Sequence, residues 1–168
     1  MAADVNPFVP ALAATFAGLG FGNAGVHVPH ANAYPIAGRV RDFHPDGYPR
    51  DEPMVPHGMA VALTAPEAFR WTFESDPERH LAAARLLDPG HGDRWDSDPR
   101  DVLPGVLVDL MRDIGLPNGL HAVGYGEHDV DARVDGSLKQ QRLLATSPRE
   151  VHVDDLAGII TRSLHLWD

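Results

Sequence analysis

Apolar residues recur at three- and four-residue steps along several stretches of the chain, the spacing that places them on one face of an α-helix. Between Asp101 and Ile114 this spacing is followed by Gly115, a residue type that readily adopts the left-handed conformation in which many helices end. The apolar positions of this stretch are Val102, Val106, Leu107, Leu110 and Ile114. We therefore predict a helix over 101–114.

The same periodicity, bounded by polar start and stop signals, predicts further helices. Asp76-Pro77 is typical of an N-cap followed by a first-turn proline. Asp154 and Asp155 occupy the end of a helix where its dipole favours carboxylates. The apolar face that follows them consists of Leu156, Ile159, Ile160, Leu164 and Trp167. Helices are expected over 57–69, 78–87, 127–138 and 156–167, with a loop over 39–56 and a turn at 116–119. Alternating β-branched runs are lacking in the sequence, so we predict one all-α domain over 1–168, a bundle of five to seven helices.

The N-terminal segment is apolar on every side. Asn6-Pro7 is typical of a helix start, and Ala11–Ala24 consists mainly of alanine, glycine and larger apolar residues. A helix that is apolar all round belongs in the middle of a bundle. Its glycines each cost about 1 kcal/mol relative to alanine and would be tolerated where neighbouring backbones pack closely. The expected structure is a buried helix.

A membrane span or targeting signal is the alternative for this segment, because no acidic or basic residue occurs over 5–38. A signal peptide begins with a basic region, whereas Met1-Ala2-Ala3-Asp4 is acidic. A membrane span needs about 20 dominantly apolar residues, and His27, His30 and Asn32 interrupt the run. These features favour a buried helix and disfavour a membrane segment.

Composition narrows the choice of function. The 168 residues carry a formal net charge of −10, which disfavours binding to a phosphate backbone. The chain has no cysteine, which excludes disulfides, zinc–thiolate sites and a thiol nucleophile.

Gly20-Phe-Gly22-Asn-Ala-Gly25 matches the GxGxxG fingerprint of dinucleotide binding, and Asp42 lies where a ribose-binding acid is expected. The fingerprint requires a strand before its turn, and the residues that precede it here form helices rather than strands. We therefore interpret the glycines as positions where helices approach each other closely.

Several histidines are candidate metal ligands. On one helix, His27, His30 and Tyr34 would stand at i, i+3 and i+7 and share a face. His57 comes from another segment, and the loop before it can fold back toward them. Converging neutral imidazoles bind divalent metals, although an HxxH pair taken alone is also common among surface histidines.

The residues around these histidines resemble the iron-containing alcohol dehydrogenase family, and most of all its hydroxyacid–oxoacid transhydrogenase branch. The resemblance runs from about 11 to 167. It is carried by Phe21-Gly-Asn-Ala-Gly-Val-His, His30-Ala-Asn-Ala-Tyr-Pro-Ile-Ala-Gly38, Val55-Pro-His-Gly58, Asp76-Pro-Glu-Arg-His-Leu-Ala, Gly119-Leu, Val123-Gly-Tyr125, Gln140-Gln-Arg142 and Pro148.

The resemblance implies a two-domain enzyme of which this chain is the C-terminal helical, dehydroquinate synthase-like domain, with the N-terminal NAD-binding domain absent. It implies a metal, usually Fe(2+) with Zn(2+) as the alternative, held by one Asp and three His. Two of these ligands correspond to His30 and His57. Tyr34 occupies a position near the nicotinamide, where it would orient substrate or relay a proton; a purely structural hydroxyl is the alternative. His27 corresponds to no ligand.

The implied reaction is hydride transfer between a hydroxy acid such as 4-hydroxybutyrate and an oxo acid such as 2-oxoglutarate, with NAD as the carrier. Arg39, Arg41 and Arg142 are candidates for binding carboxylates, with ordinary surface roles as the alternative. The resemblance also implies a cytoplasmic location, mitochondrial in eukaryotic relatives, and leaves a homo-oligomer open. We expect the isolated chain to be inactive without an N-terminal half. A non-catalytic helical interaction or metal-binding remnant is the alternative function.

Two departures from the family pattern bear on the ligands. Pro29 lies between the histidines and would break or kink a regular helix, at a cost of about 3 kcal/mol, or end a helix so that His30 begins a turn. Ala31-Asn32 replaces the Gly-Met that is usual in relatives.

Overall fold

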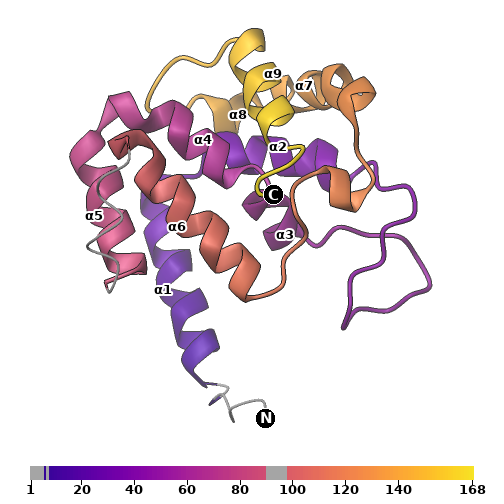
Figure 1. The fold of residues 1–168 in the computed structure, drawn as a ribbon, viewed down its shortest axis with the longest axis horizontal. Helices are drawn as coiled ribbons and strands as arrows, with labels where there is room; N and C mark the ends of the chain where they lie inside the picture. Colours follow the sequence, from indigo (N-terminus) through magenta and orange to yellow (C-terminus); the bar gives the residue numbers. More distant parts are fainter. Residues whose placement is uncertain (1–5, 7, 90–97) are drawn as a thin grey trace.

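The structure is a computed structural model that describes residues 6, 8–89 and 98–168. Over these residues it is all-α, as predicted, and contains no strand. Figure 1 shows the helices packed around α2, with α1 leading away from them toward the N-terminus. The α-helices are α1 (Phe8–Ala24), α2 (Val28–Ala37), α3 (His57–Ala62), α4 (Ala65–Thr72), α5 (Pro77–Leu87), α6 (Pro99–Asp113), α7 (Val130–Leu138), α8 (Gln141–Leu144) and α9 (Val153–Arg162). The short 3-10 turns are η1 (Phe73–Ser75), η3 (His121–Val123) and η4 (Glu127–Asp129).

Helix α1 begins and ends close to its predicted bounds, but the prediction that it is buried is wrong. None of its residues is buried, and its large apolar side chains, among them Phe8 and Phe16, are exposed. A side chain added at Gly18, Gly20 or Gly22 would meet nothing within 4 Å, so these glycines allow no close helix approach here. The reason is the sharp turn between α1 and α2. The two helices are bent by 113° relative to each other, and this directs α1 away from the core.

The turn itself is made by Gly25, whose φ of +77° is a conformation that other residues rarely adopt. A β-carbon at this position would also come within 3.2 Å of the Thr146 side chain. Within the described residues, no single helix is long and apolar enough to cross a membrane, although α1 and α2 together meet that test by length and composition alone.

Helix α2 forms the centre of the main core. Val28, Ala31, Ala33 and Ile36 are completely buried, and α2 packs against α3, α7 and α8. Leu156, Ile159 and Ile160 of α9 close the core, as predicted. The helix predicted over 156–167 ends at Arg162, so Leu164 and Trp167 pack on the core from the segment after the helix. A smaller apolar cluster joins α5 and α6 through Ala84, Val102, Leu103 and Val106.

Several predicted boundaries are confirmed. The Asp76 carboxylate accepts a hydrogen bond from the backbone N–H of Arg79 (3.1 Å) and caps α5. Residues 39–56 form a loop, and Gly115 has a φ of +74° directly after α6. Others differ: the helix predicted over 57–69 divides into α3 and α4, because Pro66 has no N–H to donate and instead lies in the first turn of α4.

Replacing a glycine with alanine should have opposite effects on stability at two sites, Gly136 in α7 and Gly105 in α6. In Gly136→Ala the new methyl would lie 2.4 Å from Cβ of Pro35, so we expect a loss of about 1–3 kcal/mol in the free energy of unfolding. Gly105→Ala in α6 meets nothing within 4 Å and should gain up to about 1 kcal/mol from helix propensity. Urea unfolding of both variants tests this, and equal shifts would show that α2 and α7 do not pack this closely.

Candidate metal centre

His30 and His57 lie together on one face of the domain. His30 is in the first turn of α2, and His57 is the first residue of α3, after the loop has folded back along α2. Their ring centroids are 5.5 Å apart, with the ring planes at 58°. The two imidazoles are therefore neighbours although 26 residues separate them in the sequence.

This separation fits two ligands of one ion. A metal–nitrogen bond of about 2.1 Å puts each ring centroid about 3.2 Å from the ion, so two imidazoles at a tetrahedral angle have centroids about 5.2 Å apart. The observed value of 5.5 Å is close to this. The distance between the two ring centroids is thus compatible with two ligands of one tetrahedral ion.

Burial lowers the pKa of the His30 imidazole, and the charge that His57 would carry lowers it further. Both effects favour the neutral ring, which is the form that binds a metal. His30 is half-buried, whereas His57 is exposed, so the pair is accessible from solvent.

Tyr34 borders the same pair. Its ring lies 6.4 Å from that of His57 and is half exposed, so its hydroxyl is available at the edge of the site. Among the residues that the structure describes, no group of three or more His, Cys, Asp or Glu side chains could hold a metal. On this part of the chain, the imidazoles of His30 and His57 are therefore the two candidate ligands that lie together.

His27 does not share the face of His30 and Tyr34, contrary to prediction. It is the N-cap residue that precedes α2, and its ring packs edge-on against Phe69 of α4 at 5.9 Å. Pro29 explains the difference, because it lies in the first turn of α2, where a missing N–H costs little. The helix begins at Val28, one residue before this proline, and neither breaks nor ends there.

Asn32 holds α2 in place, a role that was not predicted from the sequence. It is completely buried, accepts a hydrogen bond from the Ser137 hydroxyl of α7 (2.8 Å) and donates one to the Thr64 hydroxyl before α4 (3.4 Å). An asparagine on an otherwise apolar helix face is the signal that could have identified it, since a buried amide needs partners.

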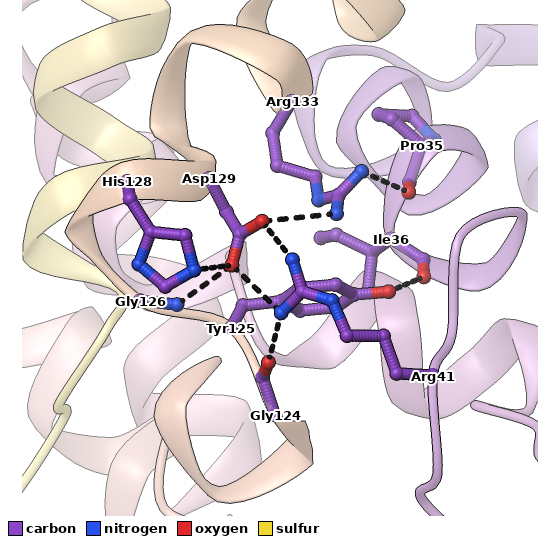
Figure 2. Close-up of polar contacts among 9 residues, drawn as sticks. All are labelled: Pro35, Ile36, Arg41, Gly124, Tyr125, Gly126, His128, Asp129 and Arg133. Atoms are coloured by element: carbon purple, nitrogen blue, oxygen red, sulfur yellow. Dashed lines mark hydrogen bonds and ion pairs between the residues drawn. The ribbon is translucent and has the colours of Figure 1, made fainter.

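A polar cluster caps the other end of α2. Figure 2 shows Tyr125 and Arg133 reaching the last carbonyl groups of the helix: the Tyr125 hydroxyl donates to the Ile36 carbonyl (2.6 Å), and Arg133 donates to that of Pro35 (3.2 Å). The last carbonyls of a helix lack partners within it, and a cation is favourable there. The cluster thus stabilises the helix that carries His30 and Tyr34.

Asp129 joins this cluster to the loop that leads to His57. Figure 2 shows its carboxylate between Arg41 and Arg133, with a further hydrogen bond from the backbone N–H of Gly126 (3.0 Å). Burial alone would raise the pKa of this carboxyl, but the hydrogen bonds from Arg41 and Gly126 and the Arg41 charge outweigh it and lower the pKa. Arg41 also donates to the Gly124 carbonyl (2.8 Å), which fixes the start of the loop.

The comparison with known proteins decides the family. Residues 10–164 match the Fe-containing alcohol dehydrogenase family, C-terminal. The chain belongs to this family. It is 40% identical over 157 residues to the probable mitochondrial hydroxyacid-oxoacid transhydrogenase of Dictyostelium discoideum, and 41% identical over 160 residues to the mitochondrial hydroxyacid-oxoacid transhydrogenase of Xenopus tropicalis. These matches cover 93% and 95% of this chain, and 29% and 35% of the relatives, so the chain spans about a third of their length.

Solved structures of the family share the fold. The 1,3-propanediol oxidoreductase structure superposes with a TM-score of 0.69 at 24% identity, covering 88% of this chain and 35% of that one. The alcohol dehydrogenase from Oenococcus oeni gives a TM-score of 0.66 at 24% identity, over 86% and 34%. The predicted likeness to the helical C-terminal domain of iron-dependent alcohol dehydrogenases is thereby confirmed.

Within this family domain, other candidates from the sequence take different roles. The glycines of the GxGxxG match lie at the end of α1 and in the turn after it, and Asp42 lies in the loop, so the rejection of a dinucleotide fold stands. Arg41 is engaged by Asp129, which disfavours it as a substrate ligand. Arg39 and Arg142 are exposed.

Proposed function

We propose that this domain supplies two ligands, His30 and His57, to the metal site of a metal-dependent oxidoreductase that acts on CH–OH groups. The observation that carries the proposal is the meeting of the two rings at 5.5 Å, a spacing suited to one ion. Family membership supports iron as the metal, with zinc as the alternative. The names of the relatives support hydroxyacid–oxoacid transhydrogenation.

The chemistry would divide between the metal and the side chains around it. A bound divalent ion acts as a Lewis acid that polarises the oxygen of an alcohol or carbonyl group. His30 and His57 would hold that ion in the neutral form. Tyr34, half exposed beside His57, would orient the substrate or relay a proton at its oxygen. Arg39 and Arg142 remain candidates for the carboxylate of a hydroxy acid such as 4-hydroxybutyrate or an oxo acid such as 2-oxoglutarate.

The remaining ligands and the nucleotide site would come from an NAD-binding half, either in a longer form of the chain or as a separate polypeptide. Three features support this. The described residues bring only two ligands together, the chain spans about a third of its relatives, and α1 exposes an apolar surface suited to a protein partner. The names of the relatives give a mitochondrial location for them; a cytoplasmic location for this chain remains a prediction, as does the oligomeric state.

Reconstitution tests the proposal. The chain would be mixed with Fe(2+), NAD+, 4-hydroxybutyrate and 2-oxoglutarate, alone and with the part of the Dictyostelium discoideum relative outside the 157 matched residues. We expect no turnover from the chain alone and turnover from the pair. Deuterium from labelled 4-hydroxybutyrate should then appear in the product of 2-oxoglutarate reduction without net accumulation of NADH.

A stable complex of the two polypeptides that binds no iron and transfers no deuterium would contradict the proposal. It would favour the alternative, a non-catalytic interaction domain. The matched control is the same relative's own C-terminal part in place of this chain, which establishes that the added half is competent.

A further inference from the structure

A cavity lies beside the N-terminal end of α2. It has a volume of about 460 Å³ and is formed by the residue before α2, by α4, α5 and α6, and by Pro148. Its wall is mainly apolar and includes the side chains of Phe69, Ala83 and Leu103. A volume and lining of this kind are typical of pockets for small organic molecules.

Aromatic rings give the cavity its shape. Phe69 stands edge-on to His27 on one side (5.9 Å) and to His80 on the other (6.0 Å). Aromatic rings pair favourably in edge-to-face or offset arrangements, so the Phe69 ring can pair with an aromatic ring of a ligand. The charged residues at the rim, Arg79 and Asp76, pair with each other at 3.2 Å, so they offset one another's charge. The lining therefore suits a neutral ligand with an apolar or aromatic body.

The two histidines of this wall differ in what they offer a ligand. Nδ1 of His80 lies 2.8 Å from the Asp76 carbonyl, which can only accept, so Nδ1 carries the proton. Nε2 of His80 is 3.0 Å from the Thr72 hydroxyl. Both of its nitrogens are therefore engaged within the protein.

His27 has unused hydrogen-bonding capacity. Its Nδ1 is buried and has no partner among the described residues. A buried N–H without an acceptor is costly, which favours the tautomer that carries the proton on Nε2. His27 lines the cavity, so in this tautomer its Nε2–H is the ring donor that a ligand in the cavity would use. His27 is thus suited to donate one hydrogen bond to an acceptor oxygen.

We propose that this cavity is a binding site for a small neutral carbonyl or hydroxyl compound with an apolar, preferably aromatic, body, which His27 anchors through one hydrogen bond. The site needs neither the metal nor NAD. A smaller cavity of about 220 Å³ shares His27 and Phe69 with it and is also lined by His30. The proposed site itself includes neither of the two metal-ligand candidates.

The neutral ketone 4-phenylbutan-2-one is a suitable probe, with the anion 4-phenylbutanoate as its comparison. Binding would be followed on the full chain, with EDTA present, by side-chain NMR of the phenylalanine and histidine rings. We expect saturable shifts of Phe69 and His80 and nuclear Overhauser contacts between the phenyl ring of the ketone and Phe69. The anion should bind at least about tenfold more weakly, because carboxylate burial without a counter-charge is costly.

Two variants test the site itself. Ala83→Phe fills the cavity and should abolish the shifts, whereas Ala82→Phe, on the exposed side of the same helix, should leave them unchanged. His27→Phe keeps a ring but removes the donor, so the ketone should bind up to about tenfold more weakly. The same change at His44, an exposed loop residue, should have no effect.

The proposal is overturned if the ketone gives no saturable shift up to its solubility limit, or if Ala83→Phe binds it as the unchanged chain does. The contacts to Phe69 provide a test that depends on no variant: saturable binding without them would place the ketone elsewhere and equally overturn the site. Because metal and NAD are excluded, a negative result here leaves the proposed metal centre unaffected.

Discussion

The His57→Ala variant, assembled with a competent NAD-binding half, is expected to bind iron at least about 100-fold more weakly than the unchanged pair. Loss of a residue that merely supports a metal ligand typically costs 10–100-fold in affinity, so loss of a ligand should cost at least as much. Iron(II) or cobalt(II) titration, with metal content measured after gel filtration, provides the measurement. His30→Ala should behave alike, because the two rings would share one ion.

His44→Ala is the matched control, since it removes an exposed imidazole of the same loop that leads to His57. His27→Ala adds a discriminating comparison, because His27 faces Phe69 and lies outside the pair. If His27→Ala lowers iron affinity as strongly as His57→Ala, the ligand assignment is wrong. If no histidine variant changes metal content or turnover, the domain contributes no metal ligand.

The sequence predicted the helices well where local signals agree. Asp76-Pro77 begins α5 as expected, and the common face of Leu156, Ile159 and Ile160 enters the core. Periodicity and capping act within a few residues, so they can be read without knowledge of the tertiary structure. The convergence of His30 and His57 was expected from the family resemblance, because spacing alone could not fold the loop back.

The other failures and omissions arise because burial and polar contacts depend on distant segments. An apolar helix predicts that something covers it, but no described segment buries any residue of α1. The hydrogen bonds by which Tyr125 and Arg133 cap α2 connect residues about 90 positions apart in the sequence, so no local pattern predicts them. The same holds for Asn32, whose partners come from two other parts of the chain.

Asp129→Asn is expected to lower the free energy of unfolding at pH 7 by about 3–5 kcal/mol, the usual cost of removing one partner of a buried ion pair. The Asp129 side chain is 8% exposed and that of Arg133 4%, so the substitution leaves a buried guanidinium without its carboxylate. For a domain of this size the melting temperature should fall by roughly 6–20 °C. Asp135→Asn on the exposed side of α7 is the matched control and should change stability by less than about 0.5 kcal/mol.

The pH dependence distinguishes loss of this ion pair from a general packing defect. The pKa of Asp129 is lowered in the folded protein, so its contribution is fully present above the unfolded value of about 3.9 and is lost as pH falls through the folded value. The unchanged chain should therefore lose more stability than Asp129→Asn between pH 5 and pH 3, and the gap between the two should narrow. Urea unfolding at both pH values measures the gap; one that stays constant would mean that the charge of Asp129 does not stabilise the fold. Because Arg41 holds the start of the loop to Asp129, the same variant should also loosen the placement of His57 and weaken metal binding in the assembled pair.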